Sequence, residues 1–294
     1  MIFATPYLDP KIDLVFKRIF GEHEDILRAF LNAVLPLAED QHIESLEYLP
    51  SEQVPQIPDF KNTIVDVRCR DVRGRQFIVE MQMAWTESFK QRMVFNASKA
   101  IVSQLRAGEE YRSLQPVYGL AIVDARFDDS PGYYHHYKLV SEQSSDRVLE
   151  GLELVFIELP KYDSTQLASV RESWLWFLKE AGRARHLPEK LLKTPELEEA
   201  LDLAEIAGYN EAQLDRYDRY WDYVSTQRTL FNEGAAKAME KGMEKGMEKG
   251  MARGIEEGLA RGIEKRNASL MVEALPKLIA RGFSEAEARG ILGI

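Results

Sequence analysis

Cysteine and long apolar runs are scarce in this sequence, and basic residues are outnumbered by acidic ones. Cys69 is the only cysteine, so no disulfide can form within the chain and nothing favours an oxidising compartment. No run of about 18 apolar residues occurs, which argues against a membrane-spanning helix. The first twenty residues include acidic side chains and lack the apolar run of a signal peptide. We therefore expect a soluble, cytoplasmic protein that does not bind membranes.

The charge balance excludes binding of nucleic acid through the overall field of the molecule. The formal net charge is -10, so contact with a polyanion requires a local basic patch. The motifs GxxxxGK[ST], GxSxG, CxxC and HExxH are absent, which removes several common enzyme classes. The 294 residues are 45% hydrophobic and 29% charged, an ordinary globular composition. This length suits one large domain with smaller additions.

Hydrophobic spacing divides the chain into a mixed part and a helical part. Apolar residues three and four positions apart predict two helices within 10–35, separated at Gly21. From residue 164 onward the pattern predicts only helices, including a buried one around the Trp-rich run 174–178. The remaining elements are strands over 43–49, 62–70, 76–85, 117–125 and 152–159, a loop over 50–58 and a long helix over 87–107. The predicted class is α/β with an all-helical C-terminal extension.

A glycine repeat marks the C-terminal part of the chain. Glycine recurs every four residues, each time followed by Met, Ile or Leu, at Gly242, Gly246, Gly250, Gly254, Gly258 and Gly262. On a helix this period advances about 40° per repeat, so the apolar stripe winds round the rod. Self-association through close helix packing and a weakly helical charged linker are both open interpretations. Beyond the repeat, 269–280 and 284–291 predict a small helical pair, the second opening with a capping box of Ser284 and Glu287.

The strands 62–70 and 76–85 are predicted to form a hairpin with one polar face. Their apolar rows are Val65, Val67 and Cys69 in the first strand and Phe77, Val79, Met81 and Met83 in the second. Placing both rows on one side brings Asp66, Glu80 and Gln82 together on the other. A hairpin centred on Arg73 sets Asp66 directly opposite Glu80. This register requires a three- or five-residue loop or a bulge.

A cation is expected between these opposed carboxylates. Their Cβ atoms would lie about 5 Å apart, where two like charges are destabilising. Carboxylate and amide oxygens are hard ligands that suit Mg²⁺ or Mn²⁺ better than zinc. The alternative is that Asp66 and Glu80 merely lie on a solvated sheet face. Adjacent His135 and His136 would point to opposite faces of a strand, so we interpret them as packing residues.

The predicted helix after the hairpin carries a basic stripe. Arg92, Lys99 and Arg106 are seven residues apart and would lie along one face of that helix. Such a stripe could contact DNA phosphates. A solvated helix face is the alternative interpretation. Gln104 lies in the same segment, and its position in the sequence suggests no role for it.

Several segments, taken in order, resemble one nuclease family. Asp66 followed fourteen residues later by Glu80-Met81-Gln82 resembles the D…ExQ form of the PD-(D/E)xK nuclease superfamily. The chain is more particularly similar to the recombination-promoting nuclease / putative transposase family. The matching runs are DPKIDLVFKRIFG at 9–21, IVEMQM at 78–83 and QLRAGEEYRSLQPVYGLAIVD at 104–124. The resemblance covers roughly residues 8–160 and is specific as an ordered set.

The resemblance implies a fold, a reaction and roles for the acidic pair. The fold is a restriction-endonuclease-like αβββαβ core with a mixed sheet, and the reaction is divalent-metal-dependent hydrolysis of DNA phosphodiesters. Asp66 and Glu80 would bind Mg²⁺ or Mn²⁺. Gln82 stands where the superfamily has Lys. Its amide can orient water or ligate the metal but cannot supply a positive charge.

The resemblance also suggests outer site residues and domain limits. Asp13 could add a carboxylate to the site, and Lys17 could contact a phosphate. The alternative is that Asp13 stabilises the start of its helix through the helix dipole and that Lys17 is simply solvated. Asp59, after Pro58, rivals Asp66, but it lies in a loop before the strand, so we prefer Asp66. The expected parts are a nuclease-like domain (1–160), a helical extension (161–232), the glycine-repeat helix or linker (233–266) and the small helical pair (267–294).

These patterns together predict a metal-dependent DNA endonuclease of the recombination-promoting, transposase-like type. We expect a homodimer or higher homo-oligomer, assembled through the C-terminal helices. A catalytically weak or inactive member that acts as a nucleic-acid-binding or protein-binding module is one rival function. The other is an assembly protein whose C-terminal helices do the main work.

Overall fold

The computed structural model describes residues 5–53 and 63–294. The chain divides into two compact units, Met1–Ser225 and Thr226–Ile294. Pro58 and Asp59 lie outside the described residues. The division into four parts stays a prediction.

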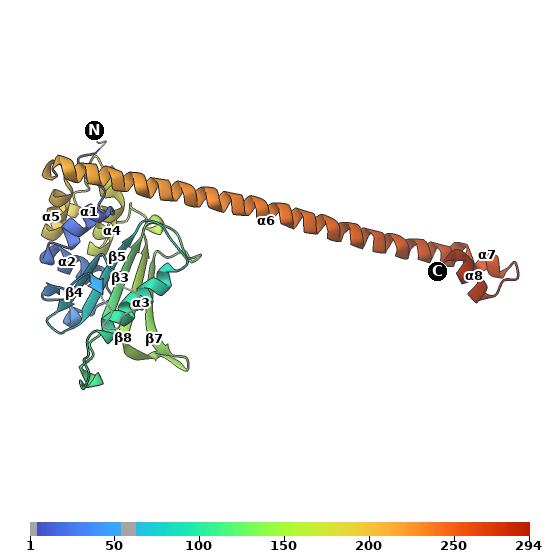
Figure 1. Cartoon of the computed structure of the whole chain (residues 1–294), viewed down its shortest axis with the longest axis horizontal. Coiled ribbons are helices and arrows are strands. Elements are labelled where there is room, and N and C mark those ends of the chain that lie inside the picture. Colours follow the sequence, from blue (N-terminus) through green and yellow to red (C-terminus); the bar gives the residue numbers. More distant parts are fainter. Residues whose placement is uncertain (1–4, 54–62) are drawn as a thin grey trace. The chain divides into compact units, whose positions relative to one another are not determined.

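The first unit is a mixed six-stranded sheet with helices (Figure 1). Its strand order is β1-β4-β5-β6-β8-β7, parallel across β5, β6 and β8 and antiparallel elsewhere. A separate two-stranded sheet pairs β2 with β3. The elements are α1 (Asp13–Phe20), α2 (Glu24–Val34), β1 (Leu46–Tyr48), β2 (Glu52–Gln53), β3 (Thr63–Ile64), β4 (Val67–Asp71), β5 (Gln76–Gln82), α3 (Phe89–Val102), β6 (Val117–Val123), β7 (Tyr134–Ser141), β8 (Ser144–Glu158), α4 (Val170–Glu180), α5 (Pro195–Ala204) and the start of α6 (Glu211–Glu273). The predicted α/β class and αβββαβ core are confirmed.

Helices cover both faces of the sheet, which creates two apolar cores. Side chains alternate along a strand, so Phe77 and Val79 pack toward α1, α2 and α4, whereas Ile78 packs toward α3. Every residue of β6 is buried, as expected for a central strand covered on both sides. The sheet is therefore the middle layer, and α3 is the helix that faces the polar end of β5.

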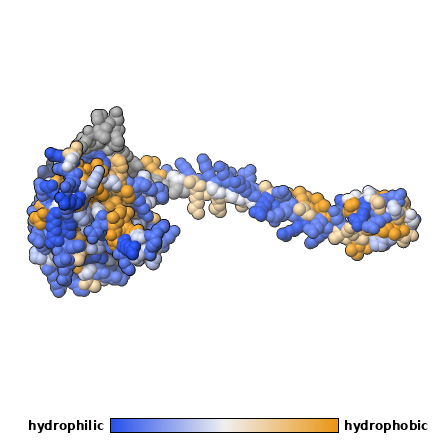
Figure 2. Space-filling view, turned by 90° about the horizontal axis from the view of Figure 1, so that it is seen from below, coloured by the Kyte–Doolittle hydropathy of each residue, from blue (hydrophilic) through white to orange (hydrophobic). Residues whose placement is uncertain are grey.

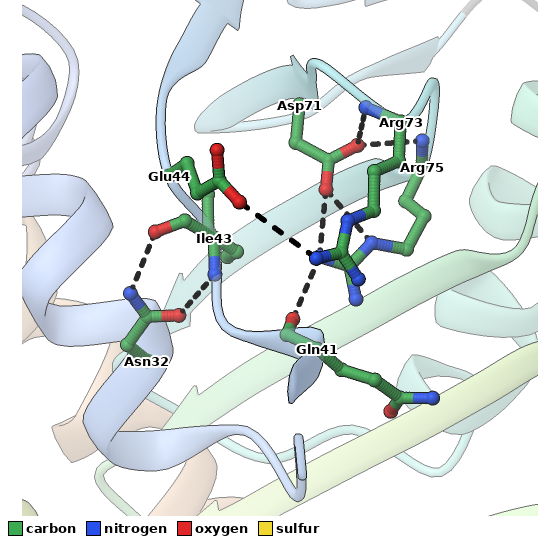
Figure 3. A network of polar contacts seen from close by, with 7 residues as sticks. All are labelled: Asn32, Gln41, Ile43, Glu44, Asp71, Arg73 and Arg75. Carbon is green, nitrogen blue, oxygen red and sulfur yellow. Dashed lines mark hydrogen bonds and ion pairs between the residues drawn. The ribbon is translucent and has the colours of Figure 1, made fainter. Parts of the chain in front are cut away.

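The β4–β5 turn fixes the register on which the acidic pair depends. Val67 pairs with Val79 and Arg70 with Gln76, so the hairpin is centred on Arg73 as predicted. The loop of residues 72–74 ends with Gly74 in the left-handed region, at φ 83°. The Asp71 carboxylate accepts hydrogen bonds from the backbone amides of Arg73 and Arg75 (Figure 3). The Arg75 guanidinium then binds both Asp71 and the carbonyl of Gln41.

We predict that Gly74→Ala destabilises the first unit by about 1–2 kcal/mol. An added Cβ would meet the side chain of Gln115 at 3.0 Å and would also be held at positive φ. Urea unfolding followed by circular dichroism measures the change. Gly108→Ala is the matched control, because Gly108 also has positive φ but a Cβ added there would meet no atom of the described residues within 4 Å. Equal losses in both variants would contradict the steric part of this argument.

The predicted strand 62–70 is wrong in one respect, because it is broken before Asp66. Val65 and Asp66 fall between β3 and β4, and the Met81 amide donates to the Asp66 carboxylate instead of to a strand carbonyl. Val65 consequently packs beside Ile78 in the α3 core, not with Val67 and Cys69 as predicted. The break turns the side chain of Asp66 toward β5.

Other elements also differ from the predicted ranges. The helix predicted over 87–107 ends at Val102, because Gln104 exchanges two hydrogen bonds with the backbone of Gln115 and turns the chain toward β6. Arg106 is therefore off the helix, and the predicted three-residue basic stripe does not form. β8 begins at Ser144, earlier than predicted, and pairs with β7, which was not predicted. β7 lacks the apolar alternation of a typical strand because much of it is exposed at the sheet edge.

The second unit is helical. α6 continues through the glycine repeat, and the apolar residues that follow the glycines are 56–76% exposed. Hydrophobic and hydrophilic patches both appear on the surface of this unit (Figure 2). α7 (Leu275–Ile279) and α8 (Glu285–Leu292) form the terminal pair, and the predicted capping box of Ser284 and Glu287 is present. In the described residues of both units, we find no helix both long and apolar enough to cross a bilayer.

Candidate active site

The predicted acidic pair lies where β4 begins opposite β5. Asp66 immediately precedes Val67, whose partner is Val79, so the register sets Asp66 against Glu80. The Oδ2 atom of Asp66 accepts a hydrogen bond of 2.7 Å from the Met81 amide, which holds the carboxylate toward β5. Glu80 is only 5% exposed. Asp66 and Glu80 are therefore close enough for the charge of Asp66 to raise the pKa of Glu80.

Helix α3 closes this site from the side. Asn96 is fully buried, and its Nδ2 donates to Oε1 of Glu80 at 3.0 Å. Arg92, one turn earlier on the same face, donates from Nη2 to Oε1 of Gln82 at 2.7 Å and lies 3.4 Å from Oε2 of Glu80. The Gln82 amide nitrogen donates to the carbonyl of Ala84 at 2.6 Å. Arg92 belongs to the predicted basic stripe. Its contacts with Glu80 and Gln82, and the hydrogen bond from Asn96 to Glu80, were not predicted from the sequence.

Burial and nearby negative charge raise the pKa values of both carboxyl groups. Burial raises the pKa of Glu80 to about 7, and the charge of Asp66 adds to the rise, while Arg92 and Asn96 oppose it. Burial also raises the pKa of Asp66, against the lowering effect of the Met81 hydrogen bond. The surrounding positive charge thus does not fully compensate the two carboxylates.

The donor set fits a divalent metal ion. Asp66, just before β4, and Glu80, in the neighbouring β5, offer hard carboxylate oxygens, the ligand type that Mg²⁺ and Mn²⁺ prefer. The raised pKa values of both groups indicate a place where added positive charge would be stabilising. The two residues that would hold the ion are therefore Asp66 and Glu80.

Asp13 and Lys17 of α1 lie near the pair but form their own contact. The Lys17 ammonium is 2.6 Å from the Asp13 carboxylate. The charge of Asp13 contributes to the raised pKa of Asp66, and the charge of Lys17 opposes it. In the described chain, Asp13 belongs to no set of three acidic or histidine groups whose ligand atoms lie within 4.8 Å of one another. Tyr220 of α6 is also affected by these carboxylates: burial raises its pKa, and the charges of Asp13 and Asp66 raise it further.

The other predicted basic residues lie away from the acidic pair. The Lys99 ammonium donates to the Gln53 carbonyl and to Thr63, which ties α3 to the β2–β3 sheet. Arg106 is exposed in the loop after α3, where its backbone amide donates to Glu109. Neither side chain is placed beside Glu80 by the contacts that it makes.

A second polar cluster, which the sequence did not reveal, lies at the end of β8. Among the described residues, Asp128, His135 and Glu158 place three metal-type ligand atoms within 4.8 Å of one another. The Lys161 ammonium already lies in this cluster, 2.7 Å from Glu158 and 2.6 Å from the carbonyl of Asp128. His135 and the Phe127 amide bind the remaining positions on Glu158. An internal cation therefore compensates the charge here, and the cluster serves to hold the loop after β6.

Comparison with known proteins assigns the chain to a family. Residues 10–233 match the family model described as PD-(D/E)XK nuclease family transposase. Searches of curated proteins and of solved structures found no match. The matched segment contains the whole sheet, the acidic pair and α3, and it covers more than half of the chain. The chain therefore belongs to the PD-(D/E)XK nuclease family transposases.

Proposed function

We propose that this protein is a divalent-metal-dependent DNA endonuclease that hydrolyses phosphodiester bonds, of the recombination-promoting, transposase-like type. The observation that carries the proposal is that Asp66, which accepts from the Met81 amide, lies beside Glu80, with both pKa values raised. Membership of a nuclease family whose members use divalent metals supports it. DNA as the substrate and a homo-oligomeric assembly are parts of the same proposal.

The side chains divide the work of the proposed site. A divalent metal held by Asp66 and Glu80 would polarise the phosphate and make bound water more acidic. The Met81 amide orients Asp66, and Asn96 orients Glu80. Gln82 is engaged at both ends of its amide, so we assign it a positioning role. Lys17 is proposed to contact phosphate beside the site and Arg106 farther along the DNA, whereas Lys99 would act through the β2–β3 sheet.

Nicking of supercoiled plasmid tests the proposal. Wild-type protein is expected to nick with Mg²⁺ or Mn²⁺ and to stop in EDTA. Asp66→Asn should lower the rate by about 100-fold, because it removes one charge from the metal ligands. Asp146→Asn, on an exposed part of β8, is the matched control and should cut normally.

Two results would contradict the proposal. Equal nicking by wild type and Asp66→Asn would show that another site or a contaminant cuts the DNA. Folded wild type that binds plasmid but never nicks it would favour a nucleic-acid-binding module instead. Cleavage of an RNA of matched sequence under the same conditions tests the choice of DNA as substrate. The molar mass of the protein in solution tests whether it forms a homo-oligomer.

A further inference from the structure

The third position of the candidate site lacks a positive charge of its own. Gln82 cannot supply one, and both ends of its amide already make a hydrogen bond, since Nε2 donates to Ala84 and Oε1 accepts from Arg92. A phosphodiester gains negative charge as water attacks it, and a nearby fixed cation lowers the barrier to that step. A cation from another element is therefore the missing part of the site.

Arg92 is placed to be that cation. Its Nη2 lies between Gln82 Oε1, at 2.7 Å, and Glu80 Oε2, at 3.4 Å. Its Cζ sits 4.6 Å from the centre of the Phe89 ring, so the flat guanidinium is supported on one side. The shorter contact is with the neutral amide rather than with the carboxylate. Gln82 and Phe89 therefore hold the Arg92 guanidinium in position, in addition to its ion pair with Glu80.

The remaining donors of Arg92 are available to a substrate. Within residues 5–53 and 63–294, its side-chain hydrogen bonds use only Nη2. The side chain is 44% exposed although it reaches a buried carboxylate. A guanidinium can donate to two phosphate oxygens at once through its free N–H groups. By contrast, the Lys17 ammonium is paired with Asp13, and that of Lys99 is bound to Gln53 and Thr63.

We propose that Arg92 is a catalytic residue that contacts the scissile phosphate and supplies the positive charge that Gln82 lacks. Gln82 and Phe89 act as positioning residues for its guanidinium. The inference rests on the proposed nuclease function and assigns the site a monoanionic phosphodiester as its substrate group. Water adds across the P–O bond, the leaving oxygen takes a proton, and Arg92 stabilises the added charge on the non-bridging oxygens without changing its own protonation.

Single-turnover nicking by Arg92→Ala separates chemistry from binding. With protein in excess over plasmid, the rate should fall by about 100-fold or more, whereas affinity for the same DNA in EDTA should change about threefold or less. Arg92→Lys should recover part of the rate, because it restores the charge but not the fork of donors. Arg112→Ala is the matched control and should cut as wild type does, since Arg112 is exposed and, within the described part of the chain, its ion pair is with Glu110.

Chemical rescue distinguishes catalysis from structure. Guanidinium added at low, non-denaturing concentration should restore part of the cleavage by Arg92→Ala and none of that by Asp66→Asn. Wild-type rates in Arg92→Ala would overturn the inference and leave the proposed function intact. Loss of DNA affinity with an unchanged single-turnover rate, or a rate loss without rescue by guanidinium or by Lys, would overturn it in the same way. Wild type that cuts no DNA would overturn the proposed function and this inference together.

Discussion

Glu80→Gln is expected to lower DNA cleavage by about 1,000-fold while it stabilises the metal-free protein by an amount on the order of 2 kcal/mol. The loss follows because a charged metal ligand is removed. The gain in stability follows because the folded variant no longer buries the Glu80 carboxylate, whose pKa is raised to about 7 from an ordinary 4.5. The buried Oδ1 of Asn96 has no hydrogen-bond partner among the described residues. If the Asn96 side-chain amide rotates by half a turn, this oxygen can accept a hydrogen bond from the new amide of Gln at position 80.

The stability difference should depend on pH in a defined direction. A carboxyl group with a raised pKa binds its proton more tightly in the folded state, so its ionisation destabilises the fold. Wild type should therefore lose stability relative to Glu80→Gln as the pH rises from about 5 to 7, and the difference should level off above about 8. Below the ordinary pKa of 4.5 the two proteins should be nearly equal.

Urea unfolding in EDTA across this pH range, beside the nicking assay, measures both effects. Asp146→Asn again provides the control, because its carboxylate is exposed. A Glu80→Gln protein that is less stable than wild type at pH 8 would show that Glu80 holds the fold together. Full nicking activity in this variant would remove Glu80 from the proposed metal site.

Trp174→Ala should destabilise the first unit by about 3–5 kcal/mol. Trp174 is fully buried in α4, and its ring packs against Phe20, Phe30 and Phe177 at centroid distances of 6.0, 5.5 and 6.1 Å. Removing the indole opens a cavity where α4 meets α1 and α2. Urea unfolding followed by circular dichroism, which does not depend on tryptophan emission, gives the change.

Trp174→Phe is the matched control for this prediction. Phenylalanine keeps a ring in contact with Phe20 and Phe30 and removes the indole N–H, which has no acceptor among the described residues. We expect it to cost less than about 2 kcal/mol. Equal losses for Ala and Phe, or a loss below about 1 kcal/mol for Ala, would show that the packing of this core is not what stabilises the unit.

The parts of the fold that could be predicted are those governed by local periodicity. Alternation in the two strands around Arg73 gave the hairpin register, since a slip of one residue would have exposed an apolar row. The spacing of apolar residues located α1 and α2, and the Trp-rich run predicted the buried α4, which is confirmed. Each of these features is decided by residues close together in sequence.

The parts that could not be predicted depend on contacts between distant segments. Arg92 lies on the predicted basic stripe, and only the packing of α3 on β5 and β6 turns its charge toward Glu80 and Gln82. The break before Asp66 depends on a hydrogen bond to Met81, fifteen residues away. Gln104 shows no role until its partner Gln115 is known. Helical spacing identifies a face, but not what that face meets.

The core of the first unit sets a lower limit on the length of chain that can fold. The phenol oxygen of Tyr217, near the start of α6, accepts a hydrogen bond from the Asp9 amide, and Val224 is buried in the same core as α1 and α2. Truncation after residue 160, the domain limit expected from the sequence, would strip Trp174 and Val224 from that core and leave Phe20 and Phe30 open to water. The smallest independently stable fragment would therefore end near Ser225, so the helices that follow the sheet are structural parts of the nuclease unit.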